Sequence, residues 1–171
     1  MLSLEPWDES GFALLEACNT PAMTAFLGGP ESAEKLADRH RRYLNLTATG
    51  RGAWPFRAML DGVAIGSIGY WEDELAYEIG WAVIPSFQGR GLARAAVELA
   101  LDDAAARGGF DTMTACPGVA NLPSNALARG LGFELAGEET IEYPAGQFMQ
   151  ANRWVYDLTR RDLTQRQRSS D

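Results

Sequence analysis

The spacing of hydrophobic residues changes several times along the chain, and each change predicts a different element. Apolar residues recur every three or four positions, which is typical of helices, over residues 7–18, 31–46, 92–106 and 124–131. Apolar runs of strand length cover residues 2–5, 54–60, 63–71, 75–84, 110–116, 133–143 and 148–158. The pattern predicts an α/β (α+β) fold, with helices flanking a mixed, mostly antiparallel sheet.

Turn residues join three of these strands into an antiparallel meander over residues 54–84. Asp61-Gly62 favours a tight hairpin, because glycine adopts a positive φ at little cost. The polar residues 72–74 connect the next pair of strands. The strand that ends before Pro85 therefore does not belong to a parallel β–α–β unit.

The length of 171 residues, of which 46% are hydrophobic and 22% charged, suffices for one domain with a substantial core. No internal repeat or linker divides the chain, so we expect a single domain over residues 1–159. Residues 160–171 contain four arginines and two aspartates without apolar periodicity. This composition predicts a polar, disordered C-terminal tail.

Composition also excludes several classes of protein. No apolar run approaches the roughly 20 residues that span a bilayer, and we recognise no signal peptide, so we expect a cytoplasmic protein that does not enter a membrane. Cys18 and Cys116 are far apart and predicted to be reduced, and with His40 as the one histidine we expect no metal site. His40 itself is expected to pack rather than to catalyse. The net charge of −8 disfavours nucleic acid but not a cationic amine.

The segment from Trp81 to Ala93 carries the clearest chemistry. A hydrophobic strand enters a loop with two glycines, Gly89 and Gly91, and the loop opens directly into a helix. Glycines let the backbone approach a ligand, and the first turn of a helix offers unpaired N–H groups and partial positive charge. Such a loop suits a phosphate group, although neither common phosphate-loop motif is present.

Two motifs resemble those of a known family. Gln88-x-x-Gly91-x-Ala93 resembles the Arg/Gln-x-x-Gly-x-Gly/Ala pyrophosphate signature of the GNAT acyltransferase superfamily. Asn121-x-x-Ser124, followed by Gly-Phe at 132–133, resembles a segment of its RimJ/RimL-like branch. The resemblance extends over residues 2–158. It implies a GNAT-like fold and acetyl-CoA as the acyl donor.

The resemblance also implies cofactor contacts for particular residues. Val83 and Ile84 would offer main-chain groups to the pantetheine arm and the thioester carbonyl, where their strand splays from its neighbour. Asn121 would bind the pantetheine region and Ser124 would lie near the sulfur, although both residue types also cap helices well. The pyrophosphate would be bound by the backbone amides of Gln88, Gly89, Arg90, Gly91, Leu92 and Ala93.

An acceptor amine must lose a proton before it can attack. For a lysine-like amine this costs roughly 4–5 kcal/mol at pH 7, and for an α-amine about 1 kcal/mol. The resemblance implies that Glu78 is the general base; the alternative is an exposed strand carboxylate. Glu78 precedes Val83 by five residues, roughly 16 Å along a strand, which a bulge or kink at Gly80 would shorten.

Many GNAT enzymes protonate the leaving thiolate with a late-helix tyrosine, but the matching position here is Ala128. Ser124 or water could supply the proton instead, or the thiolate could leave unprotonated. The sequence thus predicts an N-acetyltransferase that moves acetyl to a primary amine, on a protein N-terminus or a small molecule, by direct attack. The alternative is a catalytically inactive CoA-binding sensor or interaction module. Either a monomer or a homodimer is compatible with the sequence.

Overall fold

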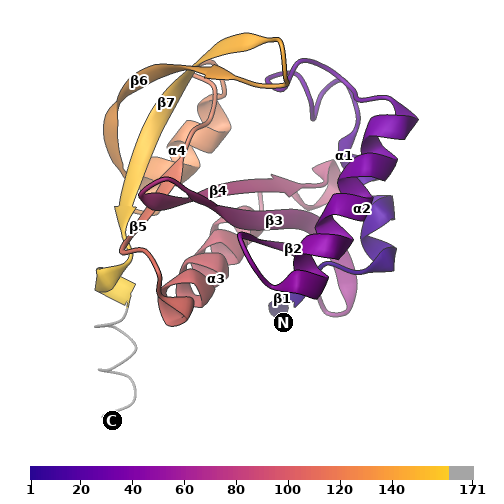
Figure 1. Ribbon diagram of the computed structural model, residues 1–171. Helices are drawn as coiled ribbons and strands as arrows, with labels where there is room; N and C mark the ends of the chain where they lie inside the picture. Colours follow the sequence, from indigo (N-terminus) through magenta and orange to yellow (C-terminus); the bar gives the residue numbers. More distant parts are fainter. Residues whose placement is uncertain (162–171) are drawn as a thin grey trace.

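A computed structural model describes residues 1–161, and its centre is a seven-stranded sheet (Figure 1). The strand order is β1-β2-β3-β4-β5-β7-β6. All neighbouring strands are antiparallel except β4 and β5, which are parallel, so the predicted mixed, mostly antiparallel sheet is confirmed. The helix Leu92–Arg107 connects these two parallel strands, so the expectation that the strand before Pro85 lies outside a parallel β–α–β unit was wrong. The strands are β1 (Leu2–Pro6), β2 (Ala53–Leu60), β3 (Val63–Asp73), β4 (Ala76–Val83), β5 (Thr112–Ala115), β6 (Glu134–Glu142) and β7 (Phe148–Asp157).

Four α-helices pack around the sheet. In Figure 1, α1 and α2 lie beside each other, and α3 lies apart from them beneath the sheet. The larger buried cluster joins the sheet to α3 and α4, and a smaller one centred on Trp7 holds α1 and α2. The helices are α1 (Phe12–Cys18), α2 (Ala33–Thr49), α3 (Leu92–Arg107) and α4 (Leu122–Gly130), with 3₁₀ turns η1 (Glu9–Gly11) and η2 (Pro85–Phe87).

Several helix boundaries differ from the prediction. The first helix was expected from residue 7, but α1 begins at Phe12, after the 3₁₀ turn η1. Helix α2 extends beyond its predicted end at residue 46 and ends at Thr49, where Gly50 adopts the left-handed conformation that stops a helix. Helix α4 begins two residues earlier than predicted. Its N-cap is Asn121 and not Ser124, because the Asn121 side chain accepts a hydrogen bond from the Ser124 N–H.

The structure describes the first two residues of the predicted tail. Of the predicted tail at 160–171, residues 162–171 lie outside the described part of the chain. Arg161 is described, and its guanidinium pairs with Asp102 at 2.9 Å and contacts Tyr156. Among residues 1–161, no helix combines the length and the hydrophobicity that a membrane span requires.

His40 has the packing role expected of it. It is 9% exposed, its Nδ1 accepts a hydrogen bond from the Trp7 indole at 3.1 Å, and its Nε2 lies 3.2 Å from a Glu9 carboxylate oxygen. The ring thus joins α2 to the segment that precedes α1.

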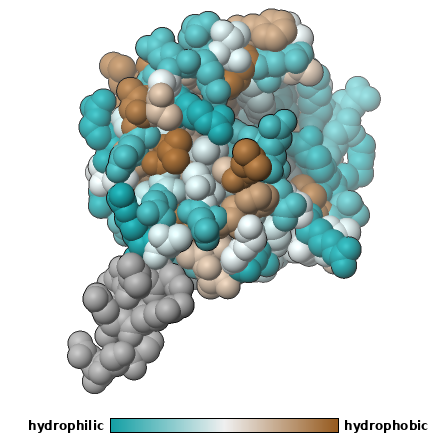
Figure 2. All heavy atoms as spheres, turned by 60° about the vertical axis from the view of Figure 1, so that its left-hand side comes forward, coloured by the Kyte–Doolittle hydropathy of each residue, from teal (hydrophilic) through white to brown (hydrophobic). Residues whose placement is uncertain are grey.

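On the face shown in Figure 2, the hydrophobic residues of the described chain form separate groups among hydrophilic ones.

Asn125 is a buried polar residue that the sequence analysis did not single out. Its side-chain amide donates to the carbonyl oxygens of Gly118 and Asn121, at 2.9 and 2.8 Å. Its carbonyl oxygen accepts from the side chains of Asn152 and Trp154, each at 2.8 Å. One side chain therefore fixes α4 both to the loop before it and to β7.

We expect Asn125→Ala to lower the free energy of unfolding by about 3 kcal/mol, because it leaves the buried Trp154 indole N–H without its partner and removes the side-chain hydrogen bonds to Gly118, Asn121 and Asn152. Denaturant unfolding measures this loss. Asn45→Ala, at an exposed position inside α2, is the matched control and should change stability by less than about 1 kcal/mol. Equal effects of the two substitutions would contradict the role given to Asn125.

Candidate active site

The glycine loop between β4 and α3 has the conformation expected of an anion site. Gly89 and Gly91 have φ values of +70° and +73°, and a Cβ at either would meet nothing within 4 Å. The positive φ values therefore favour glycine at both positions, and no other part of the protein occupies the space next to them. Gly91 is the N-cap of α3 without a side-chain cap, and the first helical hydrogen bond is made by Ala95. The N–H groups of residues 92–94 are left for water or a ligand.

Positive charge lies next to these amides. Arg90 is exposed in the loop, and its guanidinium carbon is 5.4 Å from the centre of the Phe87 ring, a cation–π contact. Together with the N-terminus of α3, this arginine gives the loop a local charge opposite to the overall charge of −8. The loop is suited to bind a phosphate through its backbone.

The parallel strands β4 and β5 separate soon after they meet. They pair only at Tyr77–Met113 and Glu78–Thr114, whereas β4 stays paired with β3 as far as Val83. From Ile79 onward, β4 therefore has a partner on one side only. This separation creates a gap beside the second half of β4, and the glycine loop lies at its end.

Backbone N–H and C=O groups of successive residues in β4 point alternately to β3 and to the gap, and two hydrogen bonds show which residues face which side. The Ile84 N–H donates to Ile65 on β3 at 2.9 Å, and the Tyr77 carbonyl accepts from Thr114 on β5. Since alternate residues direct their backbone groups to opposite sides, Trp81 and Val83 face the gap. The Ile84 carbonyl accepts from the Phe87 N–H, so both main-chain groups of Ile84 have partners within the fold.

Gln88 connects the glycine loop to two other segments. Its side-chain amide donates to the Val83 carbonyl at 2.8 Å, at the end of β4. The same nitrogen lies 3.2 Å from the sulfur of Met23, in the connection between α1 and α2. The Gln88 side chain thus fixes the glycine loop to the end of β4, the strand beside the gap.

Glu78 lies at the last β4–β5 pair, where the gap begins. Burial raises the pKa of its carboxyl group to about 7; Asp73 and Glu139 contribute in the same direction, and Arg153 opposes them. The register between β3 and β4 is continuous, so the bulge or kink considered at Gly80 is absent. On β3, Trp71 pairs with Glu78, and its ring is 3.6 Å from where a Gly80 Cβ would stand.

Cys116 is part of the same group of side chains. Its thiol donates to a Glu139 carboxylate oxygen at 3.4 Å. Burial, followed by the charge of Glu78 and the contact with Glu139, raises the pKa of the thiol to about 12. The thiol stays protonated near neutral pH, so it is not suited to act as a nucleophile.

The start of α4 brings Asn121 and Ser124 together. The Asn121 Oδ1 accepts from the Ser124 N–H at 3.3 Å, so this oxygen is committed to capping the helix. Ser124 is half-buried. Within residues 1–161, no side-chain hydrogen bond joins either residue to Glu78.

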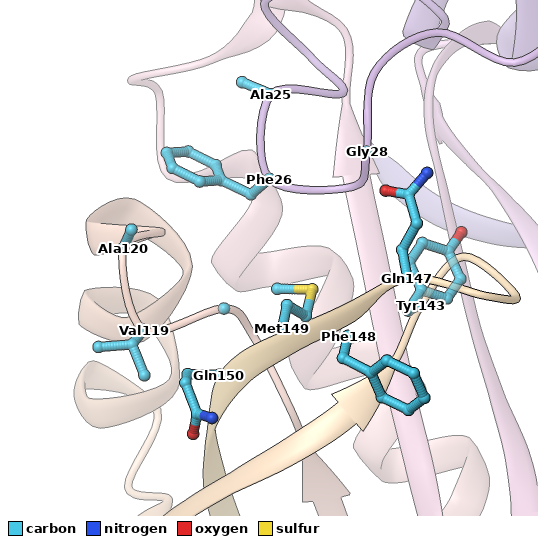
Figure 3. Close-up of a pocket in the computed structure, with 11 residues that line it drawn as sticks. Ala25, Phe26, Gly28, Val119, Ala120, Tyr143, Gln147, Phe148, Met149 and Gln150 are labelled. Carbon is cyan, nitrogen blue, oxygen red and sulfur yellow. The ribbon is translucent and has the colours of Figure 1, made fainter.

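A cavity of about 460 Å³ lies between the α1–α2 connection, the loop before α4 and the β6–β7 hairpin (Figure 3). The hairpin turn reaches the α1–α2 connection, as Figure 1 shows. None of the residues that line the cavity was predicted from the sequence to be a site residue. The cavity is lined by Ala25, Phe26, Gly28, Gly118, Val119, Ala120, Tyr143, Gln147, Phe148, Met149 and Gln150.

Comparison with solved structures identifies similar folds. A RimL ribosomal L7/L12 alpha-N-protein acetyltransferase is 25% identical, with a TM-score of 0.78 over 91% of this chain and 90% of that chain. An aminoglycoside acetyltransferase in complex with coenzyme A is 22% identical (TM-score 0.77, 96% and 99% covered). The spermidine N-acetyltransferase from Vibrio cholerae, in complex with CoA and spermine, is 17% identical (TM-score 0.77, 94% and 97% covered).

A family model agrees with this likeness and covers most of the chain. Residues 2–134 match the model described as an acetyltransferase (GNAT) domain. The match includes the strand, the glycine loop and the helix that follows it, together with the start of α4. The chain therefore belongs to the GNAT acetyltransferase family.

Proposed function

We propose that this chain is an N-acetyltransferase that moves the acetyl group of acetyl-CoA to a primary amine by direct attack. The observation that carries the proposal is the separation of β4 from β5 directly beside a loop of unpaired amides. An extended cofactor arm can lie in such a gap while the loop holds its phosphates. Solved structures of similar fold contain CoA or acetyl-CoA, which supports the choice of cofactor.

Each part of the cofactor has a counterpart in the chain. Its pyrophosphate would accept hydrogen bonds from the amides of residues 88–93, next to Arg90. The pantetheine arm would lie along β4, where the N–H groups of Trp81 and Val83 face the gap. This assignment replaces Ile84 by Trp81, since the main-chain groups of Ile84 have partners within the fold. The free amide nitrogen of Asn121 would bind the arm from the other side.

In the proposed reaction Glu78 is the general base. A carboxyl group with a pKa of about 7 is substantially ionised at neutral pH and can accept the proton of an ammonium group, directly or through water. The amine nitrogen then bonds to the thioester carbon, and the carbon–sulfur bond breaks. The electron pair leaves on sulfur, and the second proton that the nitrogen loses on becoming an amide reaches the thiolate through Ser124 or water, because no tyrosine occupies the position of Ala128. If the thiolate leaves unprotonated, water takes up that proton instead.

Release of CoA thiol on mixing the purified chain, acetyl-CoA and a panel of amines tests this function. Acetyl-CoA should also raise the melting temperature, by roughly 5–10 °C at a hundredfold excess over its dissociation constant. Binding without thiol release across the panel would instead favour the inactive CoA-binding module. Neither binding nor release would exclude both functions.

Gly91→Glu should abolish the rise in melting temperature caused by acetyl-CoA. The substitution places a side chain at a positive φ and a carboxylate where the pyrophosphate would bind. Gly50→Glu is the matched control, because Gly50 has a φ of +61°, open space around it and a place at the far end of α2. The proposed cofactor loop would be wrong if the two variants responded alike to acetyl-CoA.

Glu78→Gln should lower kcat by about 100-fold or more while leaving the acetyl-CoA-dependent melting shift intact. For the wild type, kcat/KM should rise with pH as a group with a pKa near 7 loses its proton. In the variant, this step in the pH profile should be absent. Steady-state thiol release from pH 5.5 to 8.5 measures both effects. Glu72→Gln, at an exposed neighbouring position of β3, controls for the loss of one carboxylate. An unchanged kcat would remove Glu78 from the role of base.

The raised pKa of Glu78 also predicts a dependence of stability on pH. The folded chain holds this proton more tightly than the unfolded chain, so the group stabilises the fold at low pH, and that stabilisation is lost as pH rises through 7. Between pH 8.5 and pH 5.5, wild type should gain about 2 kcal/mol relative to Glu78→Gln. Denaturant unfolding at both pH values measures the difference, and parallel pH profiles would contradict the raised pKa.

A further inference from the structure

We propose that the acceptor of this enzyme is a single primary amine attached to an uncharged, largely apolar body, and that polycationic amines are poor substrates. The inference rests on the proposed function and adds a substrate class to it. It places the body of the acceptor in the cavity between the β6–β7 hairpin and the α1–α2 connection, shown in Figure 3.

The lining of this cavity contains no charged side chain. The eleven residues are glycines, aliphatic or aromatic residues, and the two amides Gln147 and Gln150. In Figure 3, Phe26 on the α1–α2 connection lies above Met149 of β7, and Val119 lies to their left on the loop before α4. A pocket with this lining favours apolar surface and gives a buried ammonium group no counterion.

Two charged side chains adjoin the lining without being part of it, Arg39 through Tyr143 and Glu142 on the hairpin. The Tyr143 hydroxyl accepts a hydrogen bond from Arg39 at 3.2 Å, and Arg39 is paired with Glu31. The Glu142 carboxylate accepts from the Gly146 N–H at 2.7 Å, within the hairpin turn. No carboxylate therefore lies among the lining residues to pair with a second or third ammonium group of a polyamine.

The polar groups of the cavity suit neutral partners. The amide nitrogen of Gln150 donates to Thr140 at 2.7 Å, so its carbonyl oxygen is left to accept a hydrogen bond. Gly28 packs so closely against the hairpin that a Cβ would stand 2.8 Å from both Gln147 and Pro144, which fixes this wall. Neutral acceptors of this kind can bind the amide of a peptide or a hydroxyl group without requiring charge.

Apolar side chains at the cavity also remain available for contact. Phe26 is 40% exposed and Phe148 is 72% exposed. Large apolar groups left exposed at a cavity are typical of ligand-binding surfaces. The solved structures with spermine or an aminoglycoside share the fold at 17–22% identity, and their acceptors do not determine the one used here.

Competition between matched acceptors tests the inference. The purified chain and acetyl-CoA are mixed with the tripeptide amides Ala-Phe-Ala and Ala-Lys-Ala, with phenethylamine, and with spermidine and kanamycin, and thiol release gives kcat/KM. We expect the apolar acceptors to exceed Ala-Lys-Ala and both polycations by about 10-fold or more. A peptide source would favour Ala-Phe-Ala, and a small-molecule source phenethylamine.

A charge placed in the cavity should change this selectivity. Phe26→Asp should raise KM for the apolar acceptor and lower it for spermidine, each by about 10-fold. Phe26→Asn removes the same apolar area without charge, and should raise KM for the apolar acceptor alone. Val63→Asp is the matched control, since Val63 is 53% exposed in the β2–β3 hairpin and should leave both values unchanged.

The outcomes separate this inference from the proposed function. Faster acetylation of spermidine or kanamycin by wild type would overturn the inference and leave the N-acetyltransferase intact. Thiol release from none of the five acceptors would count against the enzyme itself. In that case, melting of the CoA-loaded chain with each acceptor tests the cavity directly: stabilisation by the apolar amines alone supports the inference, and stabilisation by spermidine, or by none of them, overturns it.

Discussion

The site depends on a strand that keeps one neighbour and loses the other. β4 is paired with β3 from Ala76 to Val83, but with β5 only at Tyr77 and Glu78. The bonds to β3 hold the backbone straight, so the donors that β5 leaves free stay ordered instead of collapsing onto each other. Ordered, unpaired backbone groups inside a protein require water or a ligand. A gap in the middle of the sheet is therefore a preorganised binding surface.

The remaining parts of the site are attached to this gap. Gln88 joins the glycine loop to the Val83 carbonyl and to Met23, while the segment after Met23 supplies one wall of the cavity. At the other end, Asn125 fixes the loop that follows β5 to α4 and β7. The glycine loop, the gap beside β4 and the cavity are thus connected by hydrogen bonds, although their residues are far apart in the chain.

Much of this arrangement could be predicted from the sequence. Local signals sufficed for the meander, because Asp61-Gly62 specifies its turn, and for the glycine loop, because the change from strand to helix period occurs there. The phase of β4 could not be predicted, since it depends on which side β3 occupies, and Ile84 rather than Trp81 was therefore expected at the gap. The role of Asn125 and the raised pKa of Glu78 arise from burial by distant strands, which no local pattern reports.

Within residues 1–161, β6 forms one edge of the sheet, and this edge is acidic. Four of its nine residues are glutamates: Glu134, Glu138, Glu139 and Glu142. An unpaired strand is a template for adding another strand, and natural proteins commonly place charge along such edges to prevent it. If two copies were to align through β6, carboxylates would face carboxylates across the new seam. The composition of this strand thus opposes growth of the sheet from one molecule into the next.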